Sequence, residues 1–212
     1  MIIVHHLGVS QSERITWLCE ELGIPYTLQR YDREPSGRAP ASYKALHPMG
    51  IAPVITDGSL VLAESGAIVQ YILARYGNGR LAIGPDQPNF ADYLFWFHFA
   101  NGTMMPSQMS GIFSSRLGLK QGDPMMDAMK QRSDLSYALV ERRLGEVPFF
   151  AGQEFTAADI MMFFSLSTMR NFAQQDLAAL PNVRAYLQRI GERPAYRQAM
   201  KKGDPAMPPK LG

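Results

Sequence analysis

Apolar and polar residues in the first eighty positions alternate between the period of strands and the period of a helix. Ile2–Val4 is a short β-branched run, which is typical of a strand. Apolar residues then recur at the i, i+3, i+4, i+7 spacing of one helix face, at Ile15, Leu18, Cys19 and Leu22. Tyr26–Tyr31 alternates again and predicts a second strand. Strand, helix and strand in this order favour a parallel pair joined by a right-handed crossover.

A hairpin and a further helix follow a polar loop. Val54–Thr56 and Leu60–Leu62 are apolar runs separated by Asp57-Gly58-Ser59, and Asp-Gly between two such runs is a strong hairpin signal. A short helix is expected around Ala41–Leu46, and a longer one over Ser65–Tyr76 with Ile68, Ile72 and Leu73 turned inward. The first eighty residues therefore predict a four-stranded mixed sheet with helices packed on it.

The second half carries helical signals. Residues 81–87 read as a linker, and residues 88–212 as an all-helical domain with an irregular tail from Gly203. Asn89–Phe113 is a long aromatic helical stretch, and Asp123 before Pro124 supplies a helix start. The remaining helical signals are a capping box over Thr156–Asp159 and apolar faces over Val183–Ile190 and Ala195–Lys201. The fold class is thus α/β followed by all-α.

Composition removes several classes of function. The 212 residues are 46% hydrophobic and 19% charged, enough for a buried core. A single cysteine excludes an internal disulfide framework and a cysteine-rich zinc site. A net charge of +2 provides no basic field for nucleic acid, and no apolar run approaches the roughly 20 residues of a membrane span. We expect a cytoplasmic protein without a metal.

Three short segments carry candidate chemistry. Ser10 precedes the first helix, where it is either an N-cap with Glu13 as its capping-box partner or a hydroxyl that meets an anion at the helix N-terminus. The backbone of Ala52 could turn toward a ligand if the bond to Pro53 is cis. Glu64-Ser65 is either another helix cap or a site for a ligand ammonium and carboxylate. No base stands beside Ser10 in the sequence, so a serine nucleophile is not indicated.

Four motifs in this order resemble the cytosolic glutathione transferases. Ser10–Tyr26 is similar to their first strand-helix unit, and His47–Val54 to their segment before the third strand. Leu62–Ile68 resembles their acid-serine motif, and Phe155–Ile160 the capping box of their helical domain. Asp92–Gly102 is similar to a bacterial and fungal serine-type branch. His47 replaces the usual asparagine and Ala52 the usual valine, which leaves the backbone contact intact.

The resemblance implies a thioredoxin-like domain over residues 1–80 and a function for each segment. Ser10 would contact the thiol of glutathione and lower its pKa, with Ser12 as the rival for this role. Ala52, before a cis Pro53, would bind the cysteinyl backbone, and Glu64 with Ser65 the γ-glutamyl group. One of the cations Arg38 and Lys44 could meet the glycine carboxylate.

The electrophile pocket would lie between the domains, with Met105, Met109 and Phe113 on one helix stripe as candidate lining. Family members are usually homodimers, and no metal is implied. The same site could serve a glutathione-dependent peroxidase, reductase or ether-cleaving enzyme, or the fold could be a binding module without catalysis. His5, His6 and Cys19 are expected to have structural roles.

Overall fold

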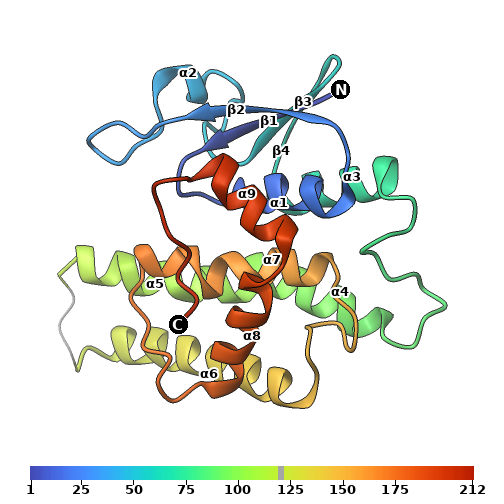
Figure 1. Cartoon of the computed structure of the whole chain (residues 1–212). Coiled ribbons are helices and arrows are strands. Elements are labelled where there is room, and N and C mark those ends of the chain that lie inside the picture. Colours follow the sequence, from blue (N-terminus) through green and yellow to red (C-terminus); the bar gives the residue numbers. More distant parts are fainter. Residues whose placement is uncertain (119–121) are drawn as a thin grey trace. The chain divides into compact units, whose positions relative to one another are not determined.

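The computed structural model describes residues 1–118 and 122–212, which form two compact units (Figure 1). The first unit contains residues 1–82 and 190–209, and the second contains residues 83–189 and 210–212. The predicted linker, residues 81–87, therefore begins close to residue 82, where the first segment of the first unit ends. The segment after residue 190, which the sequence assigned to the helical domain, is counted with the first unit instead.

The first unit is built on a mixed sheet of four strands in the order β2-β1-β3-β4. The strands are β1 (Ile2–Leu7), β2 (Tyr26–Tyr31), β3 (Val54–Asp57) and β4 (Leu60–Ala63). β1 and β2 are parallel, whereas β3 is antiparallel to both β1 and β4. The parallel pair and the Asp57–Leu60 hairpin confirm the predicted topology.

The helices of this unit are α1 (Glu13–Leu22), α2 (Ala41–Lys44), α3 (Ser65–Tyr76) and α9 (Pro194–Gly203). The predicted inward faces of α1 and α3 are buried, with Ile15, Leu18, Cys19, Leu22, Ile68, Ile72 and Leu73 each at most 7% exposed. Gly23 ends α1 in the left-handed conformation at a φ of 60°, as its position after the helix predicted. Period and end signals were therefore sufficient to place these helices.

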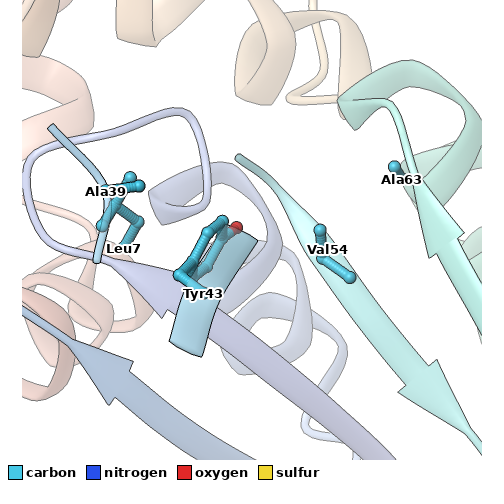
Figure 2. Packing of buried hydrophobic residues seen from close by; sticks show 5 residues of the cluster. All are labelled: Leu7, Ala39, Tyr43, Val54 and Ala63. Atoms are coloured by element: carbon cyan, nitrogen blue, oxygen red, sulfur yellow. The ribbon is translucent and has the colours of Figure 1, made fainter. Parts of the chain in front are cut away.

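One apolar cluster closes the end of the sheet at which β1 and β4 finish and β3 begins. It consists of Leu7, Ala39, Tyr43, Val54 and Ala63, and Figure 2 shows their side chains in a row across the strand ends. Because β3 runs antiparallel to β1 and β4, the segments after β1, before β3 and after β4 leave the sheet at this same edge. The three segments that carry Ser10, Ala52 and Glu64-Ser65 therefore lie at one edge of the sheet.

Helix α9 packs on α1, beside which Figure 1 shows it in red. The rings of Trp17 and Tyr196 meet edge to face with centroids 5.1 Å apart. Arg193 pairs with both carboxylate oxygens of Glu21, at 2.7 and 2.8 Å. The sequence placed α9 with the other helices because helical period reports an apolar face but not the element that covers it.

The regular elements among the described residues of the second unit are helices, apart from an isolated bridge between Phe149 and Gly152. The unit contains α4 (Phe90–Phe99), a π-helical turn (Ala100–Met104), α5 (Met105–Arg116), α6 (Pro124–Glu146), α7 (Ala157–Leu166), a 3-10 turn (Thr168–Asn171) and most of α8 (Pro181–Gly191). The wide turn interrupts the stretch predicted over Asn89–Phe113. In the part of the chain that the structure describes, no helix is both long and apolar enough to cross a membrane.

The predicted helix starts of this unit are confirmed. Asp123 accepts a hydrogen bond from the backbone N–H of Met125 at the start of α6. At the start of α7, Thr156 and Asp159 form a complete capping box. Every residue of α7 is buried, which makes this helix the centre of the unit's core.

Candidate active site

The residues predicted to hold a ligand lie on the edge closed by the Figure 2 cluster. Ser10 follows β1, Ala52 and Pro53 precede β3, and Glu64 and Ser65 follow β4. The Ala52–Pro53 peptide bond is cis, as the resemblance implied. Pro53 is buried and Ala52 packs in part against the cluster.

The turn between β1 and α1 has an unusual backbone. Val9 adopts a φ of +52°, a left-handed conformation that is rare for a β-branched residue. Its N–H donates to Oδ1 of Asp204 at 3.1 Å, and its carbonyl accepts from Nη2 of Arg33 at 3.0 Å. Arg33 Nε also donates to the carbonyl of Gly8 at 2.8 Å. A strained residue persists only where its surroundings hold it, and here two distant side chains do so.

Ser10 lies just after this strained residue and is 6% exposed. Helix α1 begins at Glu13, and its N-cap is Ser12, whose side chain makes no capping bond. The predicted cap by Ser10 with Glu13 was therefore wrong. The Ser10 hydroxyl is turned back to the strand end instead: it donates to the carbonyl of Leu7 at 2.6 Å and accepts from the N–H of Ser12 at 3.2 Å.

A chain of hydrogen bonds extends from Ser10 into the unit. Its Oγ is 2.7 Å from Oγ of Ser12, which is 2.9 Å from Nδ1 of His6. Nε2 of His6 is 3.1 Å from Oδ2 of Asp204. Ser12 and His6 are fully buried, and Asp204 is 4% exposed. From the sequence, His6 was expected to have a structural role and no base stood beside Ser10. The fold places an imidazole one hydroxyl away from Ser10.

Asp204 is held as a carboxylate. Burial by itself raises the pKa of this carboxyl, but the hydrogen bond and charge of His6, the Val9 N–H and the charge of Arg30 together hold it below its ordinary value. An ionised carboxylate in a buried position requires such partners. Asp204 could not be found from the sequence because it lies 198 residues from His6 and follows α9.

The second half of the site is the start of α3. Glu64 is exposed and has a φ of +71°, while Ser65 is 1% exposed. Nη1 of Arg14 donates to Oγ of Ser65 at 3.0 Å, and this hydroxyl lies 3.4 Å from Oε1 of Gln11. Sequence reasoning did not single out Arg14 or Gln11, since a charged and an amide residue in the first turns of a helix are usually solvated.

The backbone at the start of α3 presents donors for an anion. The N–H of Ile68 donates to the carbonyl of Glu64 at 2.9 Å, and the N–H groups of the first turn of an α-helix point out of its N-terminal end. Such groups and the helix dipole favour a carboxylate. Arg14 adds a buried guanidinium behind them, and burial lowers its pKa to about 9.

Other candidates have simpler environments. Arg38 and Lys44 are exposed. Cys19 is a buried free thiol, and burial raises its pKa to about 12, which agrees with an inert structural role. Among residues 1–118 and 122–212, no three histidine, cysteine or acidic side chains gather as a metal site would require.

In the second unit, α5, α6 and the segment after the 3-10 turn surround a cavity of about 630 Å³. Its α5 lining comes from Ser107, Gln108, Gly111 and Ile112. Met105, Met109 and Phe113 lie on another stripe of α5; the two methionines are half-buried and Phe113 is 51% exposed. The predicted stripe is therefore present, but it is separate from this cavity.

Comparison with known proteins agrees with the fold. Residues 10–75 match the family described as glutathione S-transferase, N-terminal domain, and residues 120–202 match glutathione S-transferase, C-terminal domain. Glutathione S-transferase 3 of Schizosaccharomyces pombe is 30% identical over 95% of this chain and 88% of its own. GstB of Escherichia coli is 31% identical over 89% and 91%.

Solved structures give the same result. The glutathione S-transferase of Actinobacillus pleuropneumoniae superposes with a TM-score of 0.88 at 34% identity, over 96% of this chain and 93% of that one. A glutathione transferase homologue from Sulfitobacter with bound glutathione shares the fold, with a TM-score of 0.78 at 22% identity over 96% and 98%. A thioredoxin-like unit together with a helical unit is the fold of the glutathione transferases. This chain belongs to the glutathione S-transferase family, whose members use glutathione for conjugation.

Proposed function

We propose that this enzyme conjugates the glutathione thiolate to small apolar electrophiles, and that Ser10 activates the thiol. The observation that carries the proposal is the position of Ser10, which is held between a strained Val9 and the first turn of α1 at the sheet edge. A hydroxyl donor there stabilises a thiolate and not a thiol. It therefore lowers the pKa of the bound thiol without Ser10 becoming a nucleophile.

The required pKa change is of a size that this arrangement could supply. A free thiol has a pKa near ~8.5, so only a few per cent is thiolate at about pH 7. A shift of ~2 pH units corresponds to about 2.7 kcal/mol. One hydrogen bond to a charged group contributes roughly 1.5–3 kcal/mol, and the N-terminus of α1 roughly 0.3–1 kcal/mol.

We place the rest of glutathione by the same reasoning. The γ-glutamyl carboxylate would bind the first N–H groups of α3 at Ser65, and its ammonium would pair with the exposed Glu64. The cysteinyl backbone would pair with the backbone of Ala52, before the cis Pro53. These contacts leave the sulfur as the part of the ligand that meets Ser10.

For the electrophile we propose contacts with Met105, Met109 and Phe113. Their i, i+4, i+8 spacing on α5 forms a stripe that is only partly covered, and methionine adapts to irregular apolar ligands. Replacement of Met109 with Ala should raise KM for aryl halides several-fold and leave KM for glutathione unchanged. Equal effects on both values would contradict the assignment.

The central experiment titrates the thiolate absorbance of the enzyme–glutathione complex against pH. Ser10→Ala should move the titration and the pH–rate profile of conjugation to higher pH, with a smaller rate defect at high pH, where the thiol ionises unaided. Ser12→Ala is the companion variant, and a shift in both variants is expected if Ser12 acts behind Ser10 through their 2.7 Å contact. A shift in Ser12→Ala alone would assign the contact to Ser12, and no shift in either would leave activation to the helix terminus.

Turnover distinguishes the remaining activities. Retention on immobilised glutathione followed by turnover of an aryl halide supports conjugation. Preferential turnover of a hydroperoxide would indicate a peroxidase on the same site, and binding without turnover would indicate a binding module. We further propose a cytoplasmic homodimer of the serine-type branch, which is supported by the single buried cysteine, by bacterial and fungal relatives and by the family's usual assembly. Light scattering in solution tests the dimer.

A further inference from the structure

The geometry points to a proton relay behind the thiol: we propose that His6, paired with Asp204, accepts the thiol proton of glutathione through the hydroxyls of Ser12 and Ser10. The inference rests on the proposed contact between Ser10 and the sulfur. It assigns to His6 and Asp204 a positioning function in thiol activation, since they act through Ser10 without touching glutathione.

Before glutathione ionises, the directions of the hydrogen bonds follow from Asp204, the carboxylate at the inner end of the relay. Asp204 accepts a hydrogen bond from Nε2–H of His6. In a neutral imidazole Nδ1 is then an acceptor, and it accepts a hydrogen bond from the Ser12 hydroxyl at 2.9 Å. The Ser12 oxygen then accepts the Ser10 hydroxyl at 2.7 Å once that hydroxyl turns from the carbonyl of Leu7, to which it otherwise donates at 2.6 Å. Ser10 Oγ accepts the Ser12 N–H at 3.2 Å, which leaves one of its lone pairs for an incoming S–H.

Ionisation of the thiol reverses the direction in which each hydroxyl of the relay donates its hydrogen bond. The S–H bond breaks as its proton passes to Ser10, the proton of Ser10 passes to Ser12, and that of Ser12 passes to Nδ1 of His6. The products are a thiolate and an imidazolium that is paired with Asp204. No proton leaves the protein. The Ser10 hydroxyl now donates to the sulfur, which is the direction that thiolate stabilisation requires.

The surroundings of the pair are closely built. A Cβ on Gly203 would lie 3.0 Å from Nε2 of His6, so glycine permits the close approach at this position, whereas a Cβ on Gly8 would make an ordinary contact of 3.4 Å with Oδ1 of Asp204. The second oxygen of Asp204 is occupied by the N–H of Val9 at 3.1 Å. The carboxylate of Asp204 therefore contacts both the strained Val9 and His6.

The charged and titratable groups around the pair come from several elements. Arg30 on β2 donates to the carbonyl of Gly203 at 2.7 Å, and the charges of Arg30 and Arg33 both act on Asp204. Tyr196 on α9 is buried and is coupled electrostatically both to Asp204 and to the buried Glu13 on α1. The relay therefore lies among both positive and negative groups, and Asp204 is the one in direct contact with His6.

Proton release separates this proposal from Ser10 acting alone. Glutathione is mixed with the enzyme near neutral pH in weak buffer, and thiolate absorbance and released protons are measured together. The relay predicts far less than one proton released per thiolate formed in the wild-type enzyme. One proton per thiolate overturns the relay but leaves thiol activation intact, whereas no thiolate at all contradicts the proposed function.

Variants give the second readout. His6→Asn and Asp204→Asn should lower kcat near neutral pH at least tenfold, move the pH–rate profile upward and release about one proton for each thiolate that still forms. Their affinity for S-methylglutathione, which has no thiol proton, should stay within about twofold of wild type. His5→Asn is the matched control, because His5 is also buried on β1 but contacts Tyr31 and Thr56. An equal change in all three variants would mark the effect as structural and overturn the relay.

Discussion

Nη1 of Arg14 lies 3.0 Å from Oγ of Ser65, so the first turn of α1 is tied directly to the first turn of α3. Both side chains are at most 1% exposed. The two helices carry the candidate contacts for opposite ends of glutathione, with Ser10 before α1 and Ser65 opening α3. A buried hydrogen bond between them therefore links the two halves of the site.

Ser65→Ala should weaken glutathione binding. The substitution removes an acceptor of Arg14 and the hydroxyl that is assigned to the γ-glutamyl carboxylate. Hydrogen bonds to charged groups contribute roughly 1.5–3 kcal/mol, so the Kd should rise about tenfold or more, with a smaller effect on the chemical step. Calorimetric titration measures the Kd. An unchanged affinity in the folded variant would rule out the assignment.

Asp204→Asn should change the response of the enzyme to acid. The folded pKa of Asp204 is below its ordinary value, so the ionised group stabilises the native state above the unfolded pKa of about 3.9, and this contribution is lost as pH falls through the folded pKa. The difference in unfolding free energy between wild type and variant should therefore shrink below about pH 4. Urea unfolding at a series of pH values measures it. A difference that stays constant down to low pH would contradict the prediction.

Thr156→Ala and Asp159→Ala should destabilise the second unit to different extents. Loss of the Thr156 cap should cost about 1 kcal/mol. Asp159 also accepts from the N–H of Phe150 at 3.0 Å and the hydroxyl of Tyr186 at 3.2 Å, all buried, so its loss should cost about 3 kcal/mol or more. Chemical denaturation measures both. Asp123→Ala, at a more exposed cap, is the control and should cost less than Asp159→Ala; equal costs would contradict the account.

Trp17→Ala should destabilise the first unit by about 3–5 kcal/mol. Trp17 is 2% exposed, packs on Tyr196 of α9 and donates from Nε1 to Glu21 at 2.8 Å. Because Asp204 follows α9 directly, the variant should also lose thiol activation, seen as a higher apparent pKa of bound glutathione. Thermal unfolding and the thiolate titration measure the two effects. A destabilised variant with an unchanged titration would separate α9 packing from the relay.

Local pattern and motif order were enough to predict much of this protein. The apolar period placed the strands and most helices, and Asp57-Gly58 between apolar runs specified the hairpin. These features depend on neighbours within a few residues, which a sequence displays directly. The acid-serine pair Glu64-Ser65 was also visible because it stands at a helix start. Family resemblance supplied the rest of the predicted ligand site.

The contacts behind that site were decided by the tertiary structure alone. His6 and Ser12 are close in sequence, but the role proposed for them depends on Asp204. This residue follows α9 and lies 198 residues from His6 along the chain. Arg14 was an unremarked cation until the packing of α1 beside α3 buried it against Ser65. The sequence by itself determined which segments are helices and strands and which hydroxyls precede helices. Long-range packing decided which charge each hydroxyl meets, because hydrogen bonds and burial depend on distance in space and not along the chain.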